Sequence, residues 1–115
     1  MRTVDDVFDH HIEVFGVGDL KGILTDYDSN SAMLYKDRIW HGVEGAKQFF
    51  CMWLEDLMPP GSAFELISRL SHQQTLYITW RAETDKYIYD FGTNTFIVRD
   101  DKIWRQTVAA HIRVK

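Results

Sequence analysis

The fold is decided by residues 43–61, which read VEGAKQFFCMWLEDLMPPG. Apolar side chains recur in this stretch at the three- and four-residue spacing of an amphipathic helix. Pro59 and Pro60 end the helix, because proline has no backbone N–H and its ring clashes with the preceding turn. After Gly61 the apolar residues follow the two-residue alternation of strands. This stretch therefore marks the point at which helices give way to a sheet.

Four strand-like segments follow the break, at residues 64–71, 75–83, 87–99 and 102–114. Their connections are short enough for hairpins. Before the break, a first helix starts behind Thr3 and ends near Gly16, a short second helix follows Asp19, and a small hairpin covers residues 32–40. Helices first and strands second predict one α+β domain of residues 1–115, with helices on one face of an antiparallel sheet.

The composition supports a compact domain and excludes several partners. The chain has 115 residues with 7 Phe, 5 Tyr and 4 Trp, enough aromatic surface to form a core without disulfides or metal. A net charge of −4 argues against nucleic acid as a partner. No apolar run is long enough to span a membrane, and Cys51 is the only cysteine. We therefore expect a cytoplasmic protein without nucleic-acid or membrane partners.

Three local features carry a family resemblance: residues 18–24 (GDLKGIL), residues 41–45 (HGVEG) and residues 96–103 (FIVRDDKI). In this order and at these separations they resemble the nuclear transport factor 2-like superfamily, in particular its SnoaL-like and ketosteroid isomerase-like branch. The resemblance spans nearly the whole chain. It implies a strongly curved, cone-shaped sheet wrapped around three N-terminal helices, an interior pocket, and a homodimer. It implies no single reaction, because isomerases, dehydratases, cyclases, epoxide hydrolases and binders share this fold.

The resemblance also implies three polar positions in the pocket. His11 stands where ketosteroid isomerase-like members have an oxyanion-stabilising tyrosine, Tyr35 where they have a general-base aspartate, and Asn94 where they have a second oxyanion-hole acid. His11 also interrupts the apolar stripe of the first helix, so it faces either the pocket or the core. Tyr35 is either a pocket hydrogen-bond donor or a core tyrosine, and steroid isomerisation is not expected because a phenol is a poor base at neutral pH.

Two-residue alternation extends the pocket face from Asn94 along the strands. Together with two residues from the helical region, the candidates for ligand contact are Tyr27, Trp53, Tyr77, Arg81, Asp90, Phe96, Trp104 and Gln106. Arg81 and Asp90 become cross-strand neighbours, which form either a salt bridge at the end of the sheet or a water-activating group of the kind found in the epoxide hydrolase branch.

The opposite sheet face is then expected to be the homodimer interface, because so large an exposed apolar patch is unusual on a monomer. Its residues are Leu76, Ile78, Trp80, Tyr87, Tyr89, Phe91, Ile97 and Ile103. A register slip of one residue exchanges the two faces. His10 lies off the helical stripe and is expected in solvent. The histidine spacing matches no metal motif, and no dinucleotide loop follows a strand, so we expect neither a metal nor a cofactor.

The sequence thus predicts a pocket protein for a small hydrophobic ligand. As an enzyme it would be a cofactor-free isomerase, dehydratase or cyclase acting on a carbonyl compound, with His11 moving the proton while Tyr35 and Asn94 hold the developing oxyanion. The alternative is a non-catalytic ligand-binding or dimerisation module with the same fold. The absence of a carboxylate base deep in the pocket favours this alternative.

Overall fold

The first helix begins where its capping residues predict. In the computed structural model, which describes residues 1–115, helix α1 (Val4–Gly16) starts behind Thr3. The backbone N–H of Asp6 donates to the Thr3 hydroxyl over 3.1 Å, and the N–H of Thr3 donates to the Asp6 carboxylate over 3.0 Å. This reciprocal pair satisfies backbone donors that a helix start leaves free. Helix α2 (Leu20–Leu24) follows after a short turn and is capped by the side chain of Asp19.

The third helix ends in a wider turn than the sequence predicts. Helix α3 (Gly42–Met52) continues into a π-helical turn, η1 (Trp53–Leu57), where an unbroken α-helix was expected. The N–H of Met58 donates to the carbonyl of Trp53, five residues earlier, over 2.7 Å. Pro59 cannot extend the helix because it lacks a backbone donor. Such π-turns are rare and often lie at functional sites.

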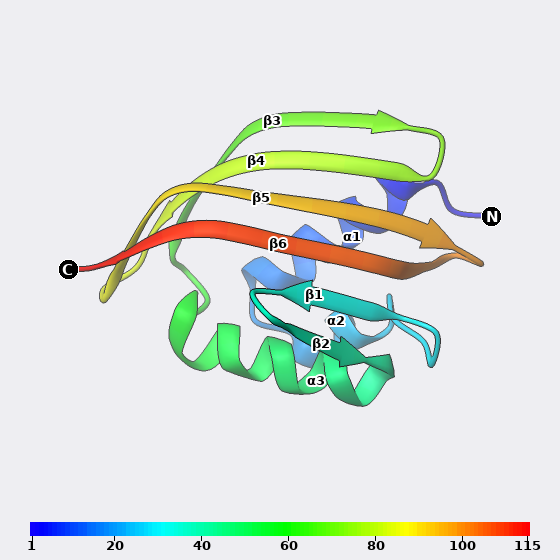
Figure 1. Cartoon of the computed structure of the whole chain (residues 1–115), viewed down its shortest axis with the longest axis horizontal. Coiled ribbons are helices and arrows are strands. Elements are labelled where there is room, and N and C mark those ends of the chain that lie inside the picture. The colour runs from blue at the N-terminus through cyan, green and yellow to red at the C-terminus, as the bar shows by residue number, and fades with distance from the viewer.

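Six strands form one curved sheet in the order β2-β1-β6-β5-β4-β3. They are β1 (Ala32–Tyr35), β2 (Arg38–His41), β3 (Ala63–His72), β4 (Thr75–Glu83), β5 (Tyr87–Arg99) and β6 (Lys102–Val114). Figure 1 shows the four long strands arching over the helices, which lie on one side of the sheet. The α+β class and the helix-then-strand order are confirmed. No helix has the length and apolar character needed to cross a membrane.

One strand pair departs from the predicted antiparallel sheet. Strand β1 runs parallel to β6, with Met33 opposite Gln106 and Tyr35 opposite Val108. Every other neighbouring pair is antiparallel. The prediction of a wholly antiparallel sheet is wrong at this position because β1 and β6 are far apart in the sequence. No tight turn joins them, so no turn fixes their relative direction.

Three β-bulges bend the sheet around the helices. The extra residue is Ile67 in β3, Asp90 in β5 and Trp104 in β6. A bulge bends its strand and increases the local twist. In β5 the bulge also changes which residues face inward: Tyr89 is buried before it, whereas Phe96 belongs to the buried set after it. Strict two-residue alternation therefore fails across Asp90.

The inner face of the sheet carries most of the residues that the sequence placed outside. The inward-facing residues that pack within or against the core are Leu76, Ile78, Trp80, Tyr87, Tyr89 and Ile103. The predicted dimer interface is wrong for these six residues. For the residues of β4 and β5, the sequence interpretation counted back from Asn94 through Asp90 and over the turn, and the bulge at Asp90 inverts that count. For Ile103, the bulge at Trp104 in β6 has the same effect. Phe91 does lie outside, with 49% of its surface exposed.

Candidate functional site

A small cavity lies between helices α1 and α3 and the inner face of the sheet. Its volume is about 50 Å³, and most of its lining is apolar. Rings from α1, α3 and β5 contribute to it, among them Phe15, Phe50 and Phe96. No carboxylate, lysine or arginine side chain lines it. Its polar atoms come from five side chains: His11, Trp53, Trp80, Asn94 and Gln106.

His11 reaches the cavity from the apolar stripe of α1. The residue is 4% exposed, and its ring centroid lies 5.5 Å from those of Phe50 and Phe96 and 6.2 Å from that of Phe15. Burial lowers the pKa of His11 to about 4, although the nearby carboxylate of Asp26 acts in the opposite direction. The imidazole is therefore neutral at physiological pH. Its Nδ1 is buried and has no hydrogen-bond partner in the protein.

Two amide side chains of the lining have their oxygens engaged by neighbours. Trp80 Nε1 donates to Asn94 Oδ1 over 3.0 Å, and the Tyr27 hydroxyl donates to Gln106 Oε1. An indole nitrogen can only donate, so the bond from Trp80 fixes which end of the Asn94 amide is the oxygen. In both side chains the NH₂ group is the end that stays free for a ligand.

Trp53 supplies a third donor at the cavity. It is the first residue of the π-helical turn and is 4% exposed. Its ring packs against Phe49 and Tyr89 at centroid distances of 5.8 and 6.1 Å. Its Nε1 is buried without a hydrogen-bond partner in the protein. Trp53 and His11 are the two side chains in the structure with such an unpartnered buried atom.

Two of the three tyrosines proposed for the site, Tyr35 and Tyr27, are buried but do not line the cavity. Tyr35 is buried, with its ring edge-on to those of Phe49 and Trp53 at 5.8 and 5.7 Å. Of the alternatives for Tyr35, the core tyrosine is the one that the structure contains, and its predicted place in the pocket is wrong. Tyr27 lies behind the lining and contacts it through Gln106. Burial, and secondarily Asp26, raises the pKa of Tyr27, so its hydroxyl stays protonated and donates.

Besides Tyr27, four predicted ligand contacts do not line the cavity: Tyr77, Arg81, Asp90 and Trp104. Tyr77, Arg81 and Asp90 face outward, because the bulge in β5 inverts the alternation from which they were placed. Arg81 pairs with Glu65 at 3.2 Å rather than with Asp90.

Asp90 instead accepts two bonds from Arg113, at 2.6 and 2.9 Å, so the water-activating arrangement does not form. Trp104 is the extra residue of the β6 bulge, and the guanidinium groups of Arg99 and Arg105 each lie 3.7 Å from its ring. By contrast, His11, Trp53, Asn94, Phe96 and Gln106 all line the cavity.

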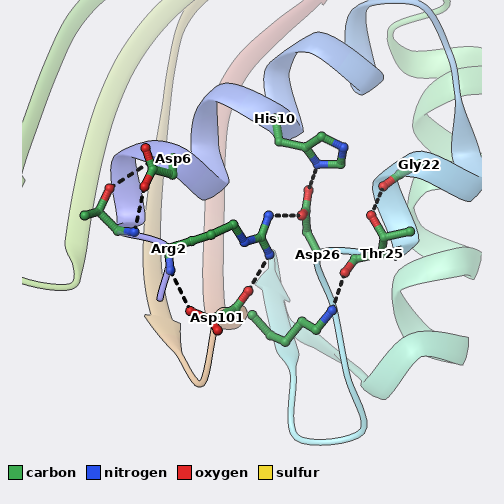
Figure 2. A network of polar contacts seen from close by, with 9 residues as sticks. Arg2, Asp6, His10, Gly22, Thr25, Asp26 and Asp101 are labelled. Carbon is green, nitrogen blue, oxygen red and sulfur yellow. Dashed lines mark hydrogen bonds and ion pairs between the residues drawn. The ribbon is translucent and has the colours of Figure 1, made fainter.

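A buried carboxylate behind the cavity escaped the sequence interpretation. Asp26 is fully buried and accepts bonds from His10 Nδ1 at 2.7 Å and Arg2 Nη1 at 3.1 Å (Figure 2). The backbone N–H of Arg2 also donates to Asp101 over 2.7 Å. The expectation that His10 lies free in solvent is therefore wrong. No local motif indicates this network, because Arg2 and His10 are 24 and 16 residues away from Asp26.

The cavity adjoins a shallow depression on the surface. The depression, of about 170 Å³, lies between the end of α1 and the segment that leads from η1 into β3. Ile12, Phe15, Met58 and Phe64 line both spaces. These four side chains therefore form the wall that the cavity and the depression share.

Comparisons with known proteins identify the fold. No family model and no curated protein matches this chain in sequence. An NTF2-like protein from Burkholderia thailandensis matches in structure with a TM-score of 0.79 at 14% identity, over 96% of this chain and 92% of that one. A Sinorhizobium meliloti protein, proposed to be a polyketide cyclase, matches with a TM-score of 0.74 at 10% identity, over 95% and 100%.

A third match is a cystatin-fold protein from Novosphingobium aromaticivorans, with a TM-score of 0.75 at 9% identity, over 95% of this chain and 99% of that one. The chain therefore has the NTF2-like, cystatin-like fold that the sequence resemblance implies. At these identities the likeness establishes the architecture and leaves the reaction and the ligand open.

Proposed function

We propose that this protein binds a small, largely apolar carbonyl compound in the cavity between its helices and its sheet. The observation that carries the proposal is the pair of buried, unpartnered ring nitrogens, His11 Nδ1 and Trp53 Nε1, on two residues of a mostly apolar lining. A buried polar group without a partner costs about 1–3 kcal/mol, which a ligand oxygen recovers by accepting a bond from Trp53 Nε1 or from His11 in the tautomer that carries its proton on Nδ1. An apolar pocket with a few convergent polar groups is typical of small-molecule sites.

The protonation of His11 favours binding over acid–base catalysis. A general base works best when its pKa lies near the working pH. With a pKa of about 4, the His11 imidazole is a weak base at neutral pH. Its neutral ring is suited to orienting a ligand, as in the non-catalytic alternative that the sequence leaves open.

The size of the cavity limits the ligand and indicates where it enters. A volume of about 50 Å³ is well below the ~300–1,000 Å³ of common ligand sites. Binding of even a six-membered ring therefore requires the wall toward the surface depression to move. Met58 is the wall residue whose side chain adapts most easily, because methionine is unbranched and has three rotatable bonds.

Titration with cyclohexanone, followed by the backbone amide resonances in NMR, tests the proposal. We expect saturable shifts confined to residues around the cavity. Trp53→Phe removes one donor to the ketone oxygen and should weaken binding about two- to tenfold, the effect of one hydrogen bond. Trp40→Phe is the matched control, because Trp40 is buried outside the cavity lining. Shifts that do not saturate, or that spread over the surface, would contradict the proposed site.

We further propose that the protein is a homodimer through the outer face of the sheet. Most residues of this interface differ from those that the sequence predicted for it. One row crosses all six strands on this face and runs Leu70, Tyr77, Thr95, Thr107, Leu34 and Ile39. Four of these six side chains are exposed large hydrophobic groups. No helix covers this side of the sheet (Figure 1).

Substituting the centre of this row with a charge should separate the subunits. In Thr95→Glu, a second copy packed on the same face would have to bury the new carboxylate without a partner, so we expect a monomer where the wild type sediments as a dimer. Val43→Glu, which introduces the same carboxylate at an exposed position of α3, should leave the dimer intact. Analytical ultracentrifugation at micromolar concentration measures both. A wild type that sediments as a monomer contradicts the interface.

A further inference from the structure

Asn94 and Gln106, the two amide side chains at the cavity, are each held in one orientation by a hydrogen bond from a neighbouring side chain. Trp80 lies on β4 directly opposite Gly92 of β5. A Cβ atom at Gly92 would lie only 2.4 Å from the Trp80 indole ring, so glycine is what allows the indole to lie across the strand. From there Trp80 Nε1 reaches Asn94 Oδ1 at 3.0 Å.

The same arrangement occurs at the other amide. Gln106 is 1% exposed, and its Oε1 accepts a bond from the hydroxyl of Tyr27, which is itself buried. Each amide oxygen therefore accepts one bond from its neighbour, which holds the amide group in one orientation. Asn94 and Gln106 are left with N–H groups for a ligand, and Trp53 adds a third N–H. In the tautomer that carries its proton on Nδ1, the neutral His11 ring adds a further N–H group.

We propose that Trp80 is a specificity-determining residue: by holding the oxygen of Asn94 it leaves the Asn94 NH₂ group to face the ligand, so that the cavity prefers ligands that present a hydrogen-bond acceptor over ligands that present only a donor. The absence of lysine and arginine from the lining narrows the class to neutral acceptors, such as ketones and esters, because a carboxylate would be buried without a countercharge. This inference rests on the proposed binding function and adds to it the residue that sets the preference for an acceptor.

Two pairs of isosteric probes test the inference. Cyclohexanone and methylenecyclohexane differ in the acceptor oxygen, and pyrrole and furan differ in the donor N–H. In the wild type we expect cyclohexanone to bind about tenfold more tightly than methylenecyclohexane, and pyrrole to gain little over furan. Trp80→Phe frees Asn94 Oδ1, so the ketone preference should fall and the preference for pyrrole over furan should rise by about fivefold.

The ratio of cyclohexanone to methylenecyclohexane affinity should fall in Trp80→Phe while the ratio of pyrrole to furan affinity rises. This opposite change distinguishes altered specificity from a loss of packing. A structural defect weakens all four probes together and leaves both ratios unchanged, and that result in Trp80→Phe would overturn the inference. Gly92→Ala is a second route, because the added methyl group displaces the indole. Trp40→Phe is the control, and its ratios should match those of the wild type. A wild type that binds methylenecyclohexane as tightly as cyclohexanone overturns the inference and also the role of the carbonyl oxygen in the proposed function. A wild type that prefers cyclohexanone, with both ratios unchanged in Trp80→Phe, overturns the inference alone.

If the wild type binds none of the four probes, the proposed function is contradicted, and a measurement on the ligand-free protein is needed to test the role of Trp80. In that case the indole N–H resonance of Trp80 decides the inference. A hydrogen bond to Asn94 shifts this proton downfield and slows its exchange with solvent. Asn94→Leu should reverse both effects, and unchanged shift and exchange in Asn94→Leu would overturn the role of Trp80.

Discussion

Replacing Asp26 with alanine is expected to lower the free energy of unfolding by about 3 kcal/mol, because removing one partner of a buried ion pair leaves the other charges uncompensated. Asp26 is fully buried against Arg2 and His10 (Figure 2). These two side chains are 36% and 38% exposed, so water partly stabilises them after the change. The expected loss therefore lies at the lower end of the range for buried pairs. Equilibrium unfolding in urea measures it.

The network ties four separate segments together, which is why the effect should be large. Arg2 precedes α1, His10 lies within it, Asp26 follows α2, and Asp101 lies in the turn between β5 and β6. Asp28→Ala is the matched control, since the Asp28 carboxylate accepts only the N–H of Asn30 in an exposed turn and should contribute less than about 1 kcal/mol. Equal losses in the two variants would show that the Asp26 network does not hold these segments together.

The sequence predicts the elements of this fold well because each carries a local signal. The reciprocal cap of Thr3 and Asp6 marks the start of α1, and the double proline marks the end of the third helix. Strands β4, β5 and β6 have the predicted bounds, because the two-residue alternation and the short turns between them are both readable. None of these signals depends on residues distant in the sequence.

The arrangement of the sheet faces is less predictable because it depends on single extra residues. The bulge at Asp90 has no proline or glycine at its position, and alternation alone gives no reason to place it there. Its effect extends over the turn into β4 and reverses the assignment of Tyr77 and Arg81. Asn94 and Phe96 lie after the bulge, on the strand where the count started, and their predicted inward orientation is confirmed.

The polar residues behind the cavity were the least predictable. His11 was found because it interrupts an apolar stripe within one helix. Asp26 was missed because its partners come from α1 and the segment before it, so only the tertiary structure brings them together. The roles of Trp80 and Tyr27 depend on which atom of a neighbouring amide they contact, which no periodicity reports. The sequence therefore predicts features that depend on one helix or strand, whereas it does not predict which polar atoms of different elements bond to each other.

The burial of His11 is expected to make the stability of the protein depend on pH. The folded protein keeps this ring neutral down to a pKa of about 4, whereas in the unfolded chain histidine titrates near its model value of 6.5. Between these two values the unfolded chain binds more protons than the folded protein does, so the free energy of unfolding falls as the pH falls. Above about pH 6.5 both states hold the ring neutral, and this group adds no pH dependence.

The expected loss is about 3 kcal/mol between about pH 7 and pH 4, because one pKa unit corresponds to about 1.4 kcal/mol. His11→Phe keeps an aromatic ring among Phe15, Phe50 and Phe96 and removes the titrating group. The difference in free energy of unfolding between the variant and the wild type should therefore shift by about 3 kcal/mol in favour of the variant on acidification. Other groups titrate in the same range, and taking the difference removes their contribution.

The control has to alter the same ring cluster without altering its titration. Phe50→Leu loosens the packing around His11, whose ring lies 5.5 Å away, and leaves the imidazole in place. We expect Phe50→Leu to lower the free energy of unfolding at every pH and to follow a profile parallel to that of the wild type. A parallel profile for His11→Phe as well would mean that His11 is protonated alike in the folded and unfolded protein. A neutral, buried His11 in the cavity, on which the proposed binding site depends, would then be ruled out.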